Sequence, residues 1–327
     1  MPKNGAKKRD LPARAIDPEA FVKILHVACN KNWFYSILLR VSRSEGRIFW
    51  GDLRMTNHYG AFNHLLFDRP APHVLRITIN NPAKMNALVR EASQQLHRIW
   101  AVVDSDPETR VTIITGAGRA FCAGGSFDGM TDGASSRDPQ EKFCEMFGDA
   151  RGLIARLIEA KKPIVSAING PAIGEGLAIA LLADISIASN TAKLLDGHLR
   201  IGVVPGDHAA LIWPLLCGMA KSKFHLMTNT PLTGEEAARC NLVSLAVPPG
   251  ELEAKSVEIA SQLANVAPTA LRMTKYVMNH YLRQNQAIFD LSAALEMVNF
   301  TGAEASEAMR AMMAKDQPVF GSESNFT

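Results

Sequence analysis

The 327-residue chain lacks several features that define large classes of proteins. It contains no run of 18 apolar residues, which excludes a membrane-spanning helix, and its cysteine usage favours a reduced compartment, with the cytoplasm as our expectation. Its five cysteines are widely spaced, with no C-x-x-C pair and no histidine pair at zinc spacing, so no disulfide framework or metal site is indicated. The motifs G-x-x-x-x-G-K-[ST] and G-x-S-x-G are also absent, which excludes a P-loop nucleotide site and a serine hydrolase with a nucleophile elbow.

Positive charge is concentrated near the N-terminus. Residues 1–54 carry 11 Lys and Arg against 5 Asp and Glu, so the remaining 273 residues carry 24 against 27. The main body is therefore slightly acidic, and we expect no nucleic-acid surface on it. Asp10, Asp17 and Glu19 argue against a mitochondrial targeting peptide, which is nearly free of acids. We expect residues 1–54 to form a basic extension outside the core.

Strand and helix patterns alternate through the middle of the chain. Residues 73–80 alternate apolar and polar side chains, as in a half-buried strand. Residues 111–115 and 163–168 are short β-branched runs bounded by Gly and Pro, which is typical of buried strands. Residues 89–106 carry apolar side chains at helical spacing. This alternation predicts the α/β fold class.

The predicted α/β core extends over residues 55–250. Beyond about residue 219 the pattern is helical almost throughout, with three further helical segments between roughly residues 250 and 315. We expect residues 251–327 to form a C-terminal helical region that serves as a lid or an oligomer contact.

Two glycine-rich turns follow predicted buried strands. They read GAGRAFCAGGSFDG (116–129) and NGPAIGEG (169–176), and neither matches a phosphate-binding loop. Such turns expose backbone N–H groups, and the second leads into a helix whose N-terminal dipole favours negative charge. Two converging N–H donors stabilise an oxyanion or enolate by several kcal/mol. Glycines also simply permit tight turns, so spacing alone leaves both interpretations open.

Four motifs in order resemble the crotonase superfamily, the enoyl-CoA hydratase/isomerase family. They are NPAKMNAL (81–88), GRAFCAGGSF (118–127), KKPIVSAINGPAIGEGLAIALLADISIAS (161–189) and IGVVPGD (201–207). The resemblance covers roughly residues 60–320. It implies a ClpP-like spiral of ββα units with a helical C-terminal region, assembled as a homotrimer or a dimer of trimers. It also implies acyl-CoA thioesters as substrates, with no tightly bound cofactor.

The resemblance assigns roles to particular residues. The N–H groups of Gly125 and Glu175 should form the oxyanion hole, and Glu175 is a departure because relatives usually carry a small residue there. Further positions correspond to contacts with substrate or the CoA nucleotide: Lys84, Asn86, Ala87, Leu88, Ala123, Gly124 and Gly174. The two glutamates with which hydratases of this family hold and split water are replaced by Ala178 and His198.

His198 and Asp207 are the acid/base candidates that the chain offers instead. A histidine with an unperturbed pKa near 6.5 accepts a proton from water at neutral pH, and a nearby carboxylate orients it. The spacing of the two residues is similar to that in 6-oxocamphor hydrolase, a crotonase-superfamily enzyme that cleaves a carbon–carbon bond in a cyclic β-diketone. Without the resemblance, His198 is equally compatible with a loop residue and Asp207 with a helix N-cap.

Three functional hypotheses follow. The first is an enoyl-CoA hydratase/isomerase-family enzyme in which a His/Asp pair replaces the two glutamates. The second is a C–C bond hydrolase that acts by retro-Claisen cleavage on a β-diketone or a β-ketoacyl-CoA. The third, of another class, is a non-catalytic family member that binds acyl-CoA without turnover.

Overall fold

The computed structural model describes residues 58–126 and 138–321, all within one compact unit assigned to Trp50–Thr327. The expected extension at residues 1–54 lies outside the described residues. No helix in the described part of the chain is long and apolar enough to cross a membrane.

A six-stranded sheet forms the centre of this unit. Its strands follow the order β1 (Leu65–Ala71), β2 (Val74–Ile79), β3 (Val111–Gly116), β4 (Ile164–Ile168), β6 (Ile185–Ser189) and β9 (Leu245–Val247). Strand β1 pairs antiparallel with β2, and every later pair is parallel. The parallel strands are nearly all apolar because both of their faces are covered.

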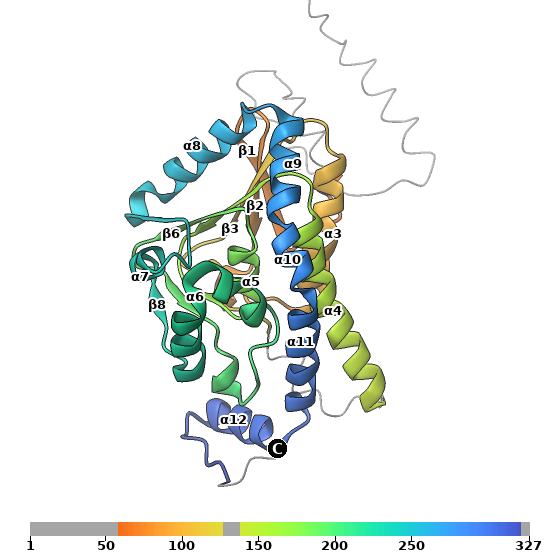
Figure 1. Cartoon of the computed structure of the whole chain (residues 1–327), viewed down its shortest axis with the longest axis vertical. Helices are drawn as coiled ribbons and strands as arrows, with labels where there is room; N and C mark the ends of the chain where they lie inside the picture. The colour runs from red at the N-terminus through yellow and green to blue at the C-terminus, as the bar shows by residue number, and fades with distance from the viewer. Residues whose placement is uncertain (1–57, 127–137, 322–327) are drawn as a thin grey trace, which may run out of the picture. The chain divides into compact units, whose positions relative to one another are not determined.

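Side chains of the sheet alternate between two apolar clusters. Ile114 and Ile168 contribute to the larger cluster, which includes residues from α3 (Arg90–Ser105) and α4 (Pro139–Glu159). Val111 and Val165 face the smaller one, beneath α8 (Leu252–Ala264). Figure 1 accordingly shows α8 on one side of the sheet and α3 with α4 on the other.

A second, three-stranded sheet lies beside the site described below. It consists of β5 (Ala172–Ile173), β7 (Lys193–Leu195) and β8 (Leu232–Thr233), in that order. Around it lie α5 (Glu175–Leu181), α6 (Ala209–Thr228) and α7 (Gly234–Arg239), the last of which begins with a Thr233–Glu236 capping box.

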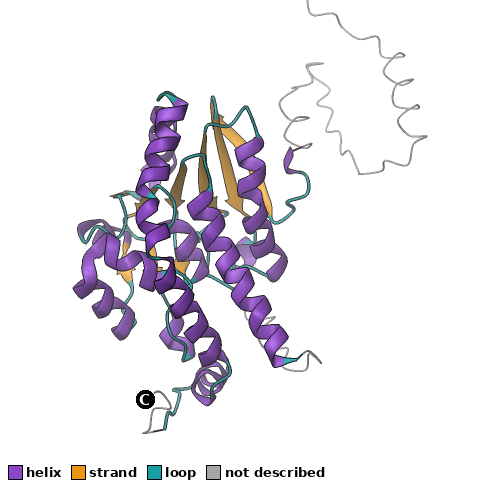
Figure 2. Cartoon of the chain, turned by 45° about the vertical axis from the view of Figure 1, so that its right-hand side comes forward, coloured by secondary structure: helices purple, strands orange, loops and turns teal. Residues whose placement is uncertain are grey.

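The chain ends in a succession of helices. After α8 come α9 (Pro268–Met278), α10 (His280–Gln284), α11 (Gln286–Phe300) and α12 (Ala303–Ala314). Helix α11 packs against α4 and α6, and Figure 2 shows this helical layer in front of the strands. Three helical segments were expected after residue 250, so the structure divides this region more finely, with breaks at Asn279 and Asn285.

The predicted alternation of strands and helices is confirmed, and the chain ends in a helical region as expected. The expectation of helices almost throughout after residue 219 is wrong in detail. Strands β8 and β9 lie in that stretch, and β9 completes the larger sheet by pairing with β6. Both strands are too short to show a clear period of two.

Candidate active site

The first glycine-rich turn begins where β3 ends and is held by the amide side chains of two asparagines. Asn86 is fully buried, and its Nδ2 donates to the carbonyls of Ala117 at 2.9 Å and Ala120 at 2.8 Å. From the end of β4, Asn169 Nδ2 donates to the carbonyl of Gly118 at 2.9 Å. Because these contacts fix the turn from two sides, its backbone is preorganised.

Two backbone donors remain open where the turns meet. Within the described residues, the N–H groups of Gly125 and Glu175 have no hydrogen-bond partner. Glu175 is the first residue of α5, and the first N–H groups of a helix have no partner within it. A Cβ placed on Gly124 would lie 3.8 Å from the Glu175 nitrogen and only 2.8 Å from the Ile173 oxygen. The two turns therefore approach closely, which requires glycine at position 124.

A further close approach joins α5 to the first turn. A Cβ on Gly176 would lie 2.4 Å from the carbonyl oxygen of Cys122, which excludes any other residue there. Cys122 is fully buried, and burial raises the pKa of its thiol to about 12, so it is a packing residue. This contact sets the start of α5 against the turn that carries Gly125.

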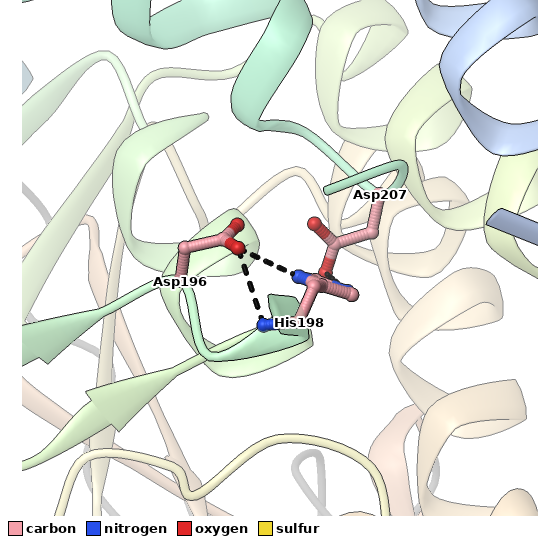
Figure 3. Close-up of side chains that lie close together, drawn as sticks. All are labelled: Asp196, His198 and Asp207. Atoms are coloured by element: carbon pink, nitrogen blue, oxygen red, sulfur yellow. Dashed lines mark hydrogen bonds and ion pairs between the residues drawn. The ribbon is translucent and has the colours of Figure 1, made fainter. Parts of the chain in front are cut away.

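His198 lies between carboxylates that come from different segments. Its Nδ1 is 3.0 Å from Asp196 Oδ2, and its Nε2 is 3.3 Å from Glu296 Oε1 and 3.7 Å from Asp207 Oδ2. Figure 3 shows the carboxylates of Asp196 and Asp207 on the two sides of the histidine. His198 is only 8% exposed. The members of this group, called the His198 cluster below, are Asp196, His198, Asp207, His208 and Glu296.

Glu296 and Asp196 were not identified from the sequence. Glu296 comes from α11, and a Cβ on Gly206 would lie 2.3 Å from its Oε2, so the Pro-Gly turn makes room for the carboxylate. A signal was present, because Glu296 shares the buried face of α11 with Phe289 and Ala293, where an acid is unusual. The signal for Asp196 was its position two residues before His198.

His208 is the neutral member of the cluster. The indole nitrogen of Trp213 donates to His208 Nε2 at 3.2 Å, and an indole N–H is a donor only. Nε2 must therefore be unprotonated, so Nδ1 carries the proton and donates it to Asp207 Oδ1. His208 is fully buried and fixes the orientation of the Asp207 carboxylate.

The charges around His198 determine its protonation. Burial alone lowers the pKa of an imidazole, but the negative charges of Asp207 and Asp196 and the hydrogen bonds to Asp196 and Glu296 raise the pKa of His198 well above its usual value. The unperturbed pKa used in the sequence argument does not hold in this environment. His198 is therefore the proton-bearing member at neutral pH.

The neighbouring carboxyl groups differ from one another as bases. Burial raises the pKa of Glu296, despite its hydrogen bond to His198. For Asp207 burial acts in the same direction, but the hydrogen bond from His208 and the charge of His198 lower its pKa. Buried oxygens without any partner in the described structure remain on Asp196 and Glu296. Glu296 is therefore the stronger base of the two carboxylates that face His198 Nε2.

Ligand atoms of Asp196, His198 and Asp207 lie within 4.8 Å of one another, a spacing that metal ions accept. However, the Nδ1 of His198 is already hydrogen-bonded to Asp196, which leaves Nε2 as its available ligand atom. The positive charge of His198 already balances part of this negative charge.

The His198 cluster adjoins the open N–H groups. A Cβ on Gly174 would lie 4.0 Å from His198 Cε1, and Gly174 directly precedes Glu175. Ala178, three residues along α5, is fully buried. The structure therefore brings together Gly125, Glu175, His198 and Asp207, as the sequence argument required.

The segment expected to contact CoA is divided between surface and core. Lys84 is exposed at the end of the 3-10 helix Pro82–Lys84, whereas Leu88 is buried and pairs with Gly125. The Asn86 side chain is used inside the protein, as described above. Ala87 and Ala123 are partly exposed near this pairing, and the N–H of Ala123 donates to the Met85 carbonyl.

Comparison with known proteins agrees with this architecture. Residues 71–323 match the family described as enoyl-CoA hydratase/isomerase. The chain is 35% identical over 205 residues to (E)-benzylidenesuccinyl-CoA hydratase of Thauera aromatica, covering 62% of this chain and 77% of that protein. It is 30% identical over 245 residues to short-chain-enoyl-CoA hydratase of Clostridium acetobutylicum, covering 73% and 90%.

A solved structure of similar fold is the enoyl-CoA hydratase/isomerase from Pseudoalteromonas atlantica T6c. It is 27% identical, with a TM-score of 0.70 over 79% of this chain and all of that one. The one from Mycobacterium paratuberculosis has a TM-score of 0.69 at 27% identity, over 76% and 98%. The chain therefore belongs to the enoyl-CoA hydratase/isomerase family of the crotonase superfamily.

Proposed function

We propose that this enzyme adds water to the double bond of an α,β-unsaturated acyl-CoA thioester, with the His198 cluster in place of two glutamates. The observation that carries the proposal is the contact between two parts: the open N–H groups of Gly125 and Glu175 lie beside a buried histidine that faces carboxylates on both sides. Both curated relatives described above are named hydratases, which supports hydration as the reaction.

The backbone donors act on the thioester. Addition to the β-carbon moves negative charge onto the thioester oxygen, and two N–H groups that point at this oxygen stabilise the resulting enolate. Helix α5 adds the positive end of its dipole at Glu175. Because both donors are backbone groups, the glutamate at position 175 leaves this function intact.

Activation of water falls to His198 and Glu296. Glu296 accepts the proton of a water molecule, because a carboxylate with a raised pKa is a better base at neutral pH than the strongly acidic Asp207. The charged His198 holds the attacking oxygen and offsets the negative charge around it. Asp196 holds the ring through Nδ1. This assignment differs from the His198/Asp207 acid/base pair predicted from the sequence, because Glu296 is the base and His198 holds the water.

The remaining parts of the proposal come from the family resemblance. Lys84 and the main chain of residues 86–88 contact the CoA nucleotide, while Ala123, Gly124 and Gly174 line the thioester. The enzyme binds CoA as part of its substrate and holds no other cofactor. It is a homotrimer or a dimer of trimers in the cytoplasm.

Mass spectrometry of products formed in isotopically labelled water tests the reaction. The enzyme and a His198→Ala variant are each incubated with crotonyl-CoA, a β-ketoacyl-CoA and a cyclic β-diketone. We expect label in a 3-hydroxyacyl-CoA, at a rate about 1000-fold lower in the variant. Label in a carboxylate released from a cleaved C–C bond would instead identify a C–C bond hydrolase. Tight acyl-CoA binding without any product would identify a non-catalytic member.

A further inference from the structure

The side chain of Glu175 has no role in the mechanism above, which uses only its N–H. Glu175 is the only ionisable residue of α5, and it lies three residues before Ala178, so the two positions share one face of the helix. Ala178 occupies the place where the resemblance expects a water-splitting glutamate. A carboxyl group one turn earlier therefore approaches the same region from the end of the helix.

One contact ties the Glu175 carboxyl to α3, the helix that follows the segment paired with Gly125. Its Oε1 accepts a hydrogen bond from the hydroxyl of Ser93 on α3. Helix α3 begins just after Leu88, which pairs with Gly125, so Ser93 belongs to the segment that flanks the first turn. The Glu175 residue is only partly buried, and its Oε2 has no hydrogen-bond partner among the described residues. This oxygen is available to a substrate.

We propose that the Glu175 carboxyl is the second proton-transfer group of the site and donates a proton to the α-carbon of the enolate held by the Gly125 and Glu175 N–H groups. The inference rests on the function proposed above and accounts for both protons that are transferred during hydration. Water gives its hydroxyl to the β-carbon and its proton to Glu296, and the C–H bond at the α-carbon forms with the proton of Glu175. Proton exchange through solvent then restores Glu175 and Glu296.

The surroundings of Glu175 suit a group that carries a proton at neutral pH. Burial, together with the charges of Asp207, Asp149 on α4 and Glu296 on α11, raises its pKa to about 7, although the Ser93 hydrogen bond lowers it. A carboxyl with this pKa gives up and regains a proton readily near pH 7. Ser93 is its positioning residue.

Two reactions allow the role of Glu175 to be tested separately from the proposed hydration. Hydration of crotonyl-CoA requires both water activation and protonation of the α-carbon. Exchange of the α-hydrogen of a saturated acyl-CoA with D₂O requires only the oxyanion hole and the group that exchanges the proton. We expect Glu175→Gln to slow both reactions about 100-fold with little change in KM. We expect His198→Ala to slow hydration alone, and the exposed control Glu251→Gln to slow neither.

Ser93→Ala supplies a milder variant that retains the carboxyl. We expect kcat to fall roughly tenfold. The limb of the pH profile that depends on Glu175 should shift to higher pH, because the hydrogen bond that lowers the pKa of Glu175 is lost. Ser93→Thr, which keeps the hydroxyl, should recover both properties. Normal α-hydrogen exchange in Glu175→Gln would overturn the role of Glu175 and leave the proposed function standing. Absence of both reactions in the unaltered enzyme would overturn the two together.

Discussion

Two groups of ionisable residues in the described part of the chain differ in how their charges are paired. One is the His198 cluster. The other, called the Lys162 cluster here, lies where β4 begins, and its members are Asp104, Asp106, Lys162, Asp184 and Lys275. Both are bound into hydrogen-bond networks, but in the second Asp106 is paired with Arg69 and Asp184 with Lys275, and Asp104 accepts from backbone N–H groups.

In the Lys162 cluster every charged group faces a partner. The ammonium of Lys162 donates to the carbonyls of Val103 and Asp106 at the end of α3, where the helix dipole favours a cation. Lys275 donates to Asp184 at 2.7 Å and to the carbonyl of Lys162 at 3.0 Å. These bonds hold α3, α9 and the start of β4 together, so the cluster serves stability.

The His198 cluster instead places three carboxylates around one imidazolium and leaves oxygens of Asp196 and Glu296 without partners in the described part of the chain. Such an arrangement costs folding free energy, because buried charge is tolerated only when it is compensated. A protein retains that cost where it performs chemistry. The comparison therefore separates a structural ion network from the proposed catalytic one by the pairing of charge rather than by burial.

Removal of Lys275 should have the largest effect on stability. Lys275→Met leaves the partly buried Asp184 carboxylate without its cation, and we expect the free energy of unfolding to fall by about 3 kcal/mol in urea titrations. The activity per folded molecule should not change. The double variant Lys275→Met, Asp184→Asn should recover part of the loss, since the amide oxygen introduced at position 184 still accepts from the Ile164 N–H. A loss below about 1 kcal/mol in the single variant would contradict the comparison.

Glu296→Gln should raise the free energy of unfolding at pH 8, whereas Lys275→Met lowers it. The pKa of Glu296 is raised in the folded state, so its contribution to stability is lost as pH rises from the unfolded pKa through the folded one. We expect the variant to be about 1–2 kcal/mol more stable than the parent at pH 8, with no difference at pH 4. Its kcat/KM should fall about 100-fold. A variant that is both less stable at pH 8 and fully active would refute the assignment of Glu296 as the base.

Tyr59→Phe should have the smallest effect on stability. It tests whether the hydrogen bonds to Asp106 in the Lys162 cluster are redundant. The Tyr59 hydroxyl donates to Asp106 Oδ2 at 2.8 Å, but the carboxylate also accepts from Arg69, Thr109 and the N–H of Glu108. These bonds outweigh burial and lower the pKa of Asp106 to about 2. Because three donors remain, we expect unfolding free energy to fall by only about 0.5–1 kcal/mol, measured by thermal and urea unfolding. A loss above about 2 kcal/mol would show that the donors are not redundant.

Local patterns predicted most of the sheet and the first helices. The run at 111–115 became β3 (Val111–Gly116), and the helical spacing within 89–106 became α3. Strand β1 was missed, because Asp68, Arg69 and Pro70 interrupt its apolar pattern at the edge of the sheet. Its pairing with β2, rather than its own composition, makes it a strand.

For the site, the sequence identified the residues that act through a backbone N–H group or through the conformation of a turn. The two turns were located next to buried strands, the roles of Gly125 and Glu175 came from the family resemblance, and Gly124 and Gly176 are required by contacts within a few ångströms. The sequence could not place Glu296, because nothing near position 296 indicates that α11 packs beside the Pro-Gly turn.

The sequence by itself determined the order of the motifs, the glycines of the two turns and hence the family to which the chain belongs. These features depend on backbone conformation and short-range spacing, which neighbouring residues fix. Only the tertiary structure decided that His198 lies between Asp196, Asp207 and Glu296 and carries a proton. The pKa of a buried group depends on burial and on charges a few ångströms away, and these charges come from segments that only folding brings together.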